Sequence, residues 1–405
     1  RLRSVLRGRD RHVCPPSGVH RRTSFCRSVR RLRRHRVRPS TACGPAALGT
    51  RLPAGVTYRA AGQEDGAPPG RPVTDSPTAS QSLQQFVNAS PWEWEPVRHE
   101  LARWVEGELR PSAWTVATTV LPKRGEHSCG VHRRFVPQLG QTVNCQLGVG
   151  LFMSDDVGAV PVDWRLHLPE RWFRPHLRRR ARIPGEARPL PMCVDIFDMV
   201  ERLHRCVGVA SAPVVAELND SRQGEDLIRL LSGRRHDFVI AVPGDFLVLP
   251  LDAYGRERSA TPLSAHHIVS RTGDLRARSA GSYLPSSAGE AAVSSCLIRL
   301  PSATQFGIRE RHVFRLFADP RRSRVAWITN MTRRRTADLA SLIEYQARSA
   351  ETVRVLERDL GLMDFEGRSY PGWHHYMTLV SAAYAYRALS DAPRGGSHAA
   401  EAVPA

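Results

Sequence analysis

Apolar and polar positions alternate along three segments in the first half of the chain. Residues 114–121 are mostly apolar, and residues 145–153 and 160–168 place apolar side chains at every second position. A period of two is typical of β-strands with one buried face. The Ser-Asp-Asp-Val-Gly sequence at 154–158 predicts a tight turn. The three segments are therefore expected to pair as an antiparallel meander.

The apolar positions change to a helical period in the next part of the chain. Residues 191–207 and 224–233 carry apolar side chains on one face of a predicted helix. They alternate with two short apolar segments, 213–218 and 237–242, which predict buried strands. Strands that alternate with helices favour parallel pairing. Three antiparallel strands followed by βαβ units predict an α/β chain, of the mixed α+β kind, with an RNase H-like core.

A long amphipathic segment at 336–360 predicts the helix that closes this core, with Thr336 as its N-cap. Three short apolar segments between residues 297 and 329 predict a β-rich insertion ahead of that helix. These elements divide the chain into six regions. They are a disordered basic segment (1–75), a short helical region (76–113), the first part of the core (114–250), a loop and β-rich insertion (251–335), the closing helices (336–390) and a flexible tail (391–405).

The chain is strongly basic. It has 405 residues and a formal net charge of +20, a balance that favours a polyanionic partner such as nucleic acid. Residues 1–51 contain 15 arginines and one acidic residue, which leaves a net charge of +6 for the rest of the chain. No aromatic RNA-binding motif accompanies the arginines, which disfavours an RNA-binding protein.

Other features of the composition bear on where the protein works. Arginine almost without lysine is typical of a GC-rich, bacterial coding sequence. The eight cysteines are scattered without a Cys-x-x-Cys pair, which argues against a structural zinc site and fits a reducing cytoplasm. No run of about 18 apolar residues occurs, so no membrane span is predicted. A bacterial cytoplasmic protein, located at the nucleoid when bound to DNA, is expected.

The most specific motifs lie beside two of the predicted strands and near the C-terminus. Residues 121–131 read Leu-Pro-Lys-Arg-Gly-Glu-His-Ser-Cys-Gly-Val, and residues 143–147 read Val-Asn-Cys-Gln-Leu. Residues 361–375 combine Gly-Leu, Phe-Glu-Gly-Arg-Ser and Gly-Trp-His-His. Together these motifs resemble the DDE-type transposases of the insertion-sequence-701 group, and the resemblance covers about residues 80–390.

The resemblance implies a DNA nuclease and strand transferase whose three carboxylates hold two Mg²⁺ ions. By this resemblance the first acidic position falls at Ala117 or Thr118, the second at Glu217 and the third at Ala350. Glu351 is adjacent, but it is rotated by about 100° around the helix axis. Only Glu217 keeps a carboxylate that could bind a metal. The chain is therefore expected to be a transposase with impaired catalysis or, alternatively, a non-catalytic DNA-binding descendant.

Basic side chains in and near these motifs are expected to contact DNA phosphates. They are Lys123, Arg133, Arg134, Arg178, Arg179, Arg180, Arg368, His374 and His375. Alternatives remain open: residues 171–182 can be a solvated basic loop, Lys123 and Arg368 can form internal ion pairs, and the two histidines can be buried. The resemblance further implies transposon ends as the DNA partner and allows a homodimer.

Overall fold

The structure is a computed structural model. All residues that it describes lie within one compact unit, Leu52–Ala405. They are residues 85–390 except 89, 137–139, 208–211, 219, 253, 260, 271–294, 302–311 and 319–324. The predicted disordered segment and the predicted flexible tail lie outside the described residues.

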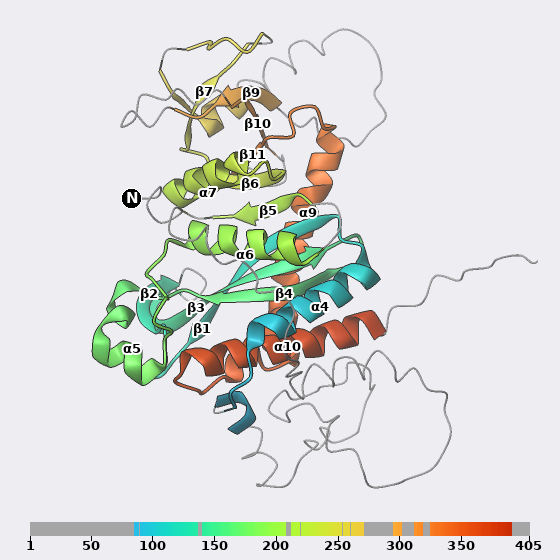
Figure 1. The fold of residues 1–405 in the computed structure, drawn as a ribbon. Coiled ribbons are helices and arrows are strands. Elements are labelled where there is room, and N and C mark those ends of the chain that lie inside the picture. Colours follow the sequence, from blue (N-terminus) through green and yellow to red (C-terminus); the bar gives the residue numbers. More distant parts are fainter. Residues whose placement is uncertain are drawn as a thin grey trace, which may run out of the picture. The chain divides into compact units, whose positions relative to one another are not determined.

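A single mixed sheet runs through the described part of the chain (Figure 1). Its first half is the predicted meander: β1 (Ala113–Pro122) pairs antiparallel with β3 (Gln141–Ser154), and β3 pairs antiparallel with β4 (Ala159–Leu166). β2 (His132–Val136) also pairs with β3. β2 was not predicted, because its residues read His-Arg-Arg-Phe-Val and carry no apolar alternation.

The second half of the core has parallel strands. β5 (Val214–Glu217) lies parallel to β1, with Val116 opposite Ala216. β6 (Phe238–Pro243) lies parallel to β5. The order β4-β3-β1-β5-β6, with three antiparallel strands followed by parallel ones, confirms the predicted mixed α/β architecture with an RNase H-like core.

The strands expected in the β-rich insertion extend the same sheet beyond β6. They are, in order along the sheet, β11 (Val325–Thr329), β10 (Phe314–Phe317) and β9 (Ser295–Arg299). Two strands that were not predicted, β7 (Leu247–Pro250) and β8 (Leu263–Ser264), follow β9 in the sheet. At the other end of this series, β11 pairs antiparallel with β6. The edge of β6 is thus covered by backbone hydrogen bonds rather than left open to solvent.

Helices pack on both faces of this sheet (Figure 1). They are α4 (Trp94–Leu109), α6 (Met192–Cys206), α7 (Ser221–Gly233), α9 (Thr336–Asp359) and α10 (Tyr370–Ser390), while α5 (Pro175–Ala181) packs on the short helix at 170–173. Trp114 and Val116 of β1 lie in the cluster that β1 forms with α4, α6 and α7. Val215 of β5 lies in the cluster formed with α9 on the other face. Within the described ranges, none of the helices has the length and apolarity to span a bilayer.

Two local predictions are wrong. The basic segment 171–182 is not a loop, because it forms the 3₁₀ helix η2 (Glu170–Phe173) and then α5. Pro175 takes the first helical position of α5, where its fixed φ suits a helix, and the arginines that follow are good helix formers. The N-cap of α9 is Arg335 rather than Thr336, and no side chain caps that end.

Candidate functional site

One face of β1 is directed at α9. The Thr115 hydroxyl contacts the Ser349 hydroxyl, and Thr119 donates a hydrogen bond to Glu357 Oε1 at 2.7 Å. Side chains alternate along a strand, so Ala117, between the two threonines, lies on this face as well. Thr118 lies on the opposite face. Of the two residues that the resemblance offered for the first acidic position, Ala117 therefore faces α9 and Thr118 does not.

Glu217 is the neighbour of Ala117 in the sheet. The parallel register pairs Val116 with Ala216, and one more residue along both strands places Ala117 beside Glu217. Val215 packs against α9, so alternation directs Glu217 to the same side. The carboxylate ends β5 and is exposed.

Ala350, which the resemblance places at the third acidic position, lies on α9. Gln346 on α9 donates from Nε2 to the backbone oxygen of Val116 at 2.7 Å. Ala350 follows one turn later on the same helix face and is half-buried. Glu351 is exposed and bonds Arg354 at 2.6 Å on the outer face of the helix. Ala350 thus lies on the side of α9 that carries Gln346 and faces β1, and Glu351 does not.

The residues at the three positions Ala117, Glu217 and Ala350 do not fit a pair of divalent cations. Mg²⁺ needs hard oxygen ligands, and two ions need several shared carboxylates. Glu217 is the one carboxylate at the three positions, and the nearby Glu357 already accepts a hydrogen bond from Thr119. Among the described residues no group of three or more His, Cys, Asp or Glu side chains could hold a metal ion.

Lys123, at the end of β1, contacts the chain itself. Its Nζ donates to the backbone oxygen of Phe365 and lies 5.8 Å from the centre of that ring. Burial lowers the pKa of Lys123, while the carboxylates of Glu366 and Asp364 oppose this shift. The half-buried ammonium therefore joins the end of β1 to the loop that follows η4 (Leu362–Asp364).

The arginines expected to face DNA divide into two groups. Arg133, Arg179, Arg180 and Arg368 are exposed, and Arg134 is half-buried. Arg178 instead donates to the backbone oxygens of Pro184 and Ala187, so its guanidinium holds the connection that leads from α5 to α6.

The two histidines are not accessible to DNA, so the prediction that they contact phosphates is wrong. His375 is buried, stacks on Trp92 with ring centres 4.0 Å apart, and its two ring nitrogens lie 2.8 Å from the backbone oxygens of Val87 and Trp92. His374 is fully buried against Trp94. Burial lowers the pKa of His374 well below its usual range, which keeps the ring neutral.

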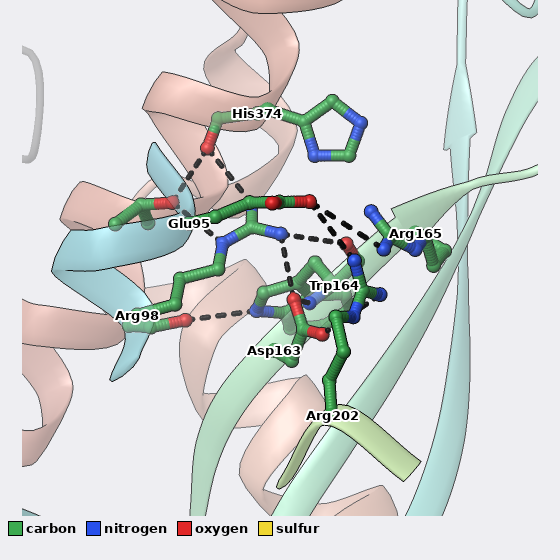
Figure 2. A network of polar contacts seen from close by, with 9 residues as sticks. Glu95, Arg98, Asp163, Trp164, Arg165, Arg202 and His374 are labelled. Atoms are coloured by element: carbon green, nitrogen blue, oxygen red, sulfur yellow. Dashed lines mark hydrogen bonds and ion pairs between the residues drawn. The ribbon is translucent and has the colours of Figure 1, made fainter. Parts of the chain in front are cut away.

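A buried arginine that the sequence analysis missed joins three elements (Figure 2). Arg98 of α4 is 3% exposed, and it donates to Asp163 at 2.8 Å, the backbone oxygen of Trp164 at 2.7 Å, that of His374 at 2.9 Å and the Thr378 hydroxyl at 2.7 Å. Burial lowers the pKa of Arg98, and the Asp163 carboxylate opposes this shift. The network fixes α4 and β4 to α10.

The sequence did contain a signal for this residue. Arg98 precedes Leu101, Ala102 and Val105 by three, four and seven positions, so it lies on the buried stripe of α4. A charged residue in an apolar stripe needs a buried partner, because an unpaired charge there is costly.

A family model described as "DDE superfamily endonuclease" matches residues 70–276, more than half of the chain. The match includes Ala117 and Glu217 and ends before α9. A comparison with curated proteins found no match. The resemblance to DDE-type transposases is thus confirmed at the level of this superfamily, and the mixed sheet has the architecture expected of it. The chain belongs to the DDE superfamily endonucleases.

Proposed function

We propose that this protein is a DNA-binding member of the insertion-sequence transposase lineage whose metal-dependent cleavage is impaired. What supports the proposal is that Ala117 and Ala350, two of the three positions at which the resemblance expects carboxylates, are neutral in a chain with an endonuclease fold. The neutral side chains at two of these positions provide no charge to offset a divalent cation. The protein would then bind Mg²⁺ too weakly to cleave or transfer a DNA strand, but it would keep the surfaces that bind DNA.

Hydrogen bonds that hold three segments beside one another support the proposal of DNA binding. Trp172 Nε1 donates to the backbone oxygen of Val131 at 3.0 Å, which joins η2 to the loop after β1. The backbone N–H of Cys129 donates to the Arg368 oxygen at 3.2 Å, and Arg182 donates to Ser369 at 2.8 Å. These hydrogen bonds hold the loop after β1, the η2–α5 segment and residues 365–369 beside one another.

Exposed arginines project from these joined segments. We call Arg179, Arg180 and Arg368 the arginine surface, with Arg133 on the adjoining strand β2. None of the three guanidinium groups has a hydrogen-bond or ion-pair partner within the described ranges. Unpaired guanidinium groups close together are suited to phosphates, because each arginine that binds a phosphate releases counterions from DNA.

Duplex DNA affinity should fall steeply with salt, and less steeply once the arginine surface is removed. In the variant with Arg179, Arg180 and Arg368 changed to alanine, the slope of log K against log salt should become shallower. The expected change is about 0.9 for each phosphate that the protein no longer neutralises. Fluorescence anisotropy with a labelled duplex over a range of salt concentrations measures both slopes.

The matched control changes Arg103, Arg205 and Arg354 to alanine. These arginines are exposed on α4, α6 and α9, so the net charge falls by the same amount. Two results would contradict a localised DNA-binding surface. One is an affinity of the unmodified protein that does not change with salt, and the other is an equal change of the salt slope in both triple variants.

Two parts of the proposal rest on the resemblance alone. Transposon ends would be the preferred DNA, and two copies would assemble on them, in the cytoplasm of a bacterium and at its nucleoid. Analytical ultracentrifugation with and without a terminal-repeat duplex tests the assembly, and a monomer under both conditions would rule out this part.

A further inference from the structure

A cavity of about 170 Å³ opens beside the arginine surface, between the loop after β1 and the η2–α5 segment. Its lining residues are Glu126, His127, Arg171, Trp172, Leu177 and Arg180. None of them belongs to the three positions Ala117, Glu217 and Ala350. The cavity is therefore a separate candidate binding site.

One wall of the cavity is fixed by the chain itself. Trp172 is fully buried, and its Nε1 donates to the backbone oxygen of Val131. The Arg171 guanidinium lies 5.7 Å from the centre of the Trp172 ring and donates from Nη2 to the same oxygen. Two groups bound to one carbonyl hold this wall in place before any ligand arrives, which reduces the entropy cost of binding.

Three polar side chains around the cavity make no hydrogen bond or ion pair within the described residues. They are Glu126, His127 and Arg180. They offer a carboxylate acceptor and two nitrogen donors at the edge of one small space. A ligand that both accepts and donates hydrogen bonds would satisfy them together.

The size and the lining point to a flat heterocycle. A cavity of about 150 Å³ accommodates a benzene molecule, so this one has room for one small ring system. The half-buried Leu177 gives it an apolar wall, which suits a ring face, and the polar groups suit a ring edge. A phosphate group has no apolar face, and the Glu126 carboxylate would repel it.

We propose that this cavity receives one unpaired nucleobase of bound DNA. The proposal rests on DNA binding by the neighbouring arginine surface, which would deliver a base to the opening. Nucleic acid enzymes hold an extruded base by stacking and by hydrogen bonds to its edge, and extrusion is easiest where the base is already unpaired.

The test compares two duplexes of one sequence, fully paired or with a single bulged nucleotide. The unmodified protein should bind the bulged duplex about tenfold more tightly, as expected for one base stacked on protein. Leu177→Trp fills the cavity and should remove this preference while leaving the affinity for paired DNA unchanged. Arg179→Ala, on the same helix but outside the cavity, should weaken both complexes and keep their ratio.

A second measurement does not depend on DNA affinity or on the fold of a bulky variant. Saturation-transfer NMR with the four deoxyribonucleosides should saturate the base protons, and Glu126→Gln at the exposed rim should change which base gives the strongest signal. Equal affinity for both duplexes would overturn the cavity proposal and leave the proposed function standing. Absence of binding to either duplex at low salt would overturn the proposed function, and absent nucleoside signals would then overturn the cavity proposal as well.

Discussion

Purified protein incubated with Mg²⁺ and DNA is expected to leave both strands uncut. The three positions Ala117, Glu217 and Ala350 offer a single carboxylate, Glu217, where a pair of hard cations needs several. A gel assay for nicked and linear products from supercoiled DNA measures this directly. Mg²⁺-dependent nicking that disappears in Glu217→Ala would show that the acidic positions have been assigned to the wrong residues.

Carboxylates introduced at positions 117 and 350 should raise the affinity of the protein for Mg²⁺. Ala117→Asp combined with Ala350→Glu places two carboxylates beside Glu217, and Mg²⁺ affinity by calorimetry should rise by about 100-fold, a factor of ten per added ligand. The matched control, Ala117→Asn with Ala350→Gln, adds similar volume without charge and should give no increase. Thr118→Asp should also fail, because that side chain lies on the other face of β1. Equal Mg²⁺ affinity for the charged and neutral pairs would refute the geometry.

Replacing Arg98 with methionine is expected to lower the free energy of unfolding by about 3–5 kcal/mol, the usual effect of breaking a buried ion pair. Methionine fills much of the same space, but it leaves the backbone oxygens of Trp164 and His374 without their donor. It also removes the closest cation from Asp163, which keeps its contact with Arg202 at 3.4 Å. Urea titration followed by tryptophan fluorescence measures the decrease in stability.

Arg103→Met is the control for the Arg98 variant. Arg103 lies on the same helix, is 53% exposed and pairs with Glu100 three residues away. A surface pair of this kind contributes about 1 kcal/mol or less, so the control should be nearly as stable as the unmodified protein. If both variants lose the same stability, the buried network does not hold α4 to α10.

The fold was largely predictable because the alternation of apolar and polar residues marks its core strands in the sequence. β1, β3 and β4 are long enough for alternation to show, and the strand and helix order at β5, α7 and β6 restricts the topology. β2 has five residues with arginines at its centre, so only its pairing with β3 defines it. A short strand is stabilised mainly by the strand with which it pairs, and the residues around it in the sequence do not identify that strand.

The candidate site was predictable in part. The resemblance implied Ala117 or Thr118, Glu217 and Ala350 as the acidic positions, but only the contacts between β1 and α9 show that Ala117 faces α9 and Thr118 does not. His374 and His375 were misassigned because polar side chains suggest exposure, whereas stacking on Trp94 and Trp92 buries them. Sequence alone gives no distance between residues 92–94 and 374–375, so their packing could not be foreseen.

The Arg98 network also constrains the order in which the protein can be made. Its partners on β4 lie 65 and 66 residues after Arg98, but His374 and Thr378 lie 276 and 280 residues after it. At about 5–20 residues per second, a ribosome needs roughly 14 to 55 seconds to add 276 residues. Throughout that interval the guanidinium has only part of its bonding, so α4 cannot settle into its final place. Complete docking of α4 is therefore a late step that waits for the synthesis of α10.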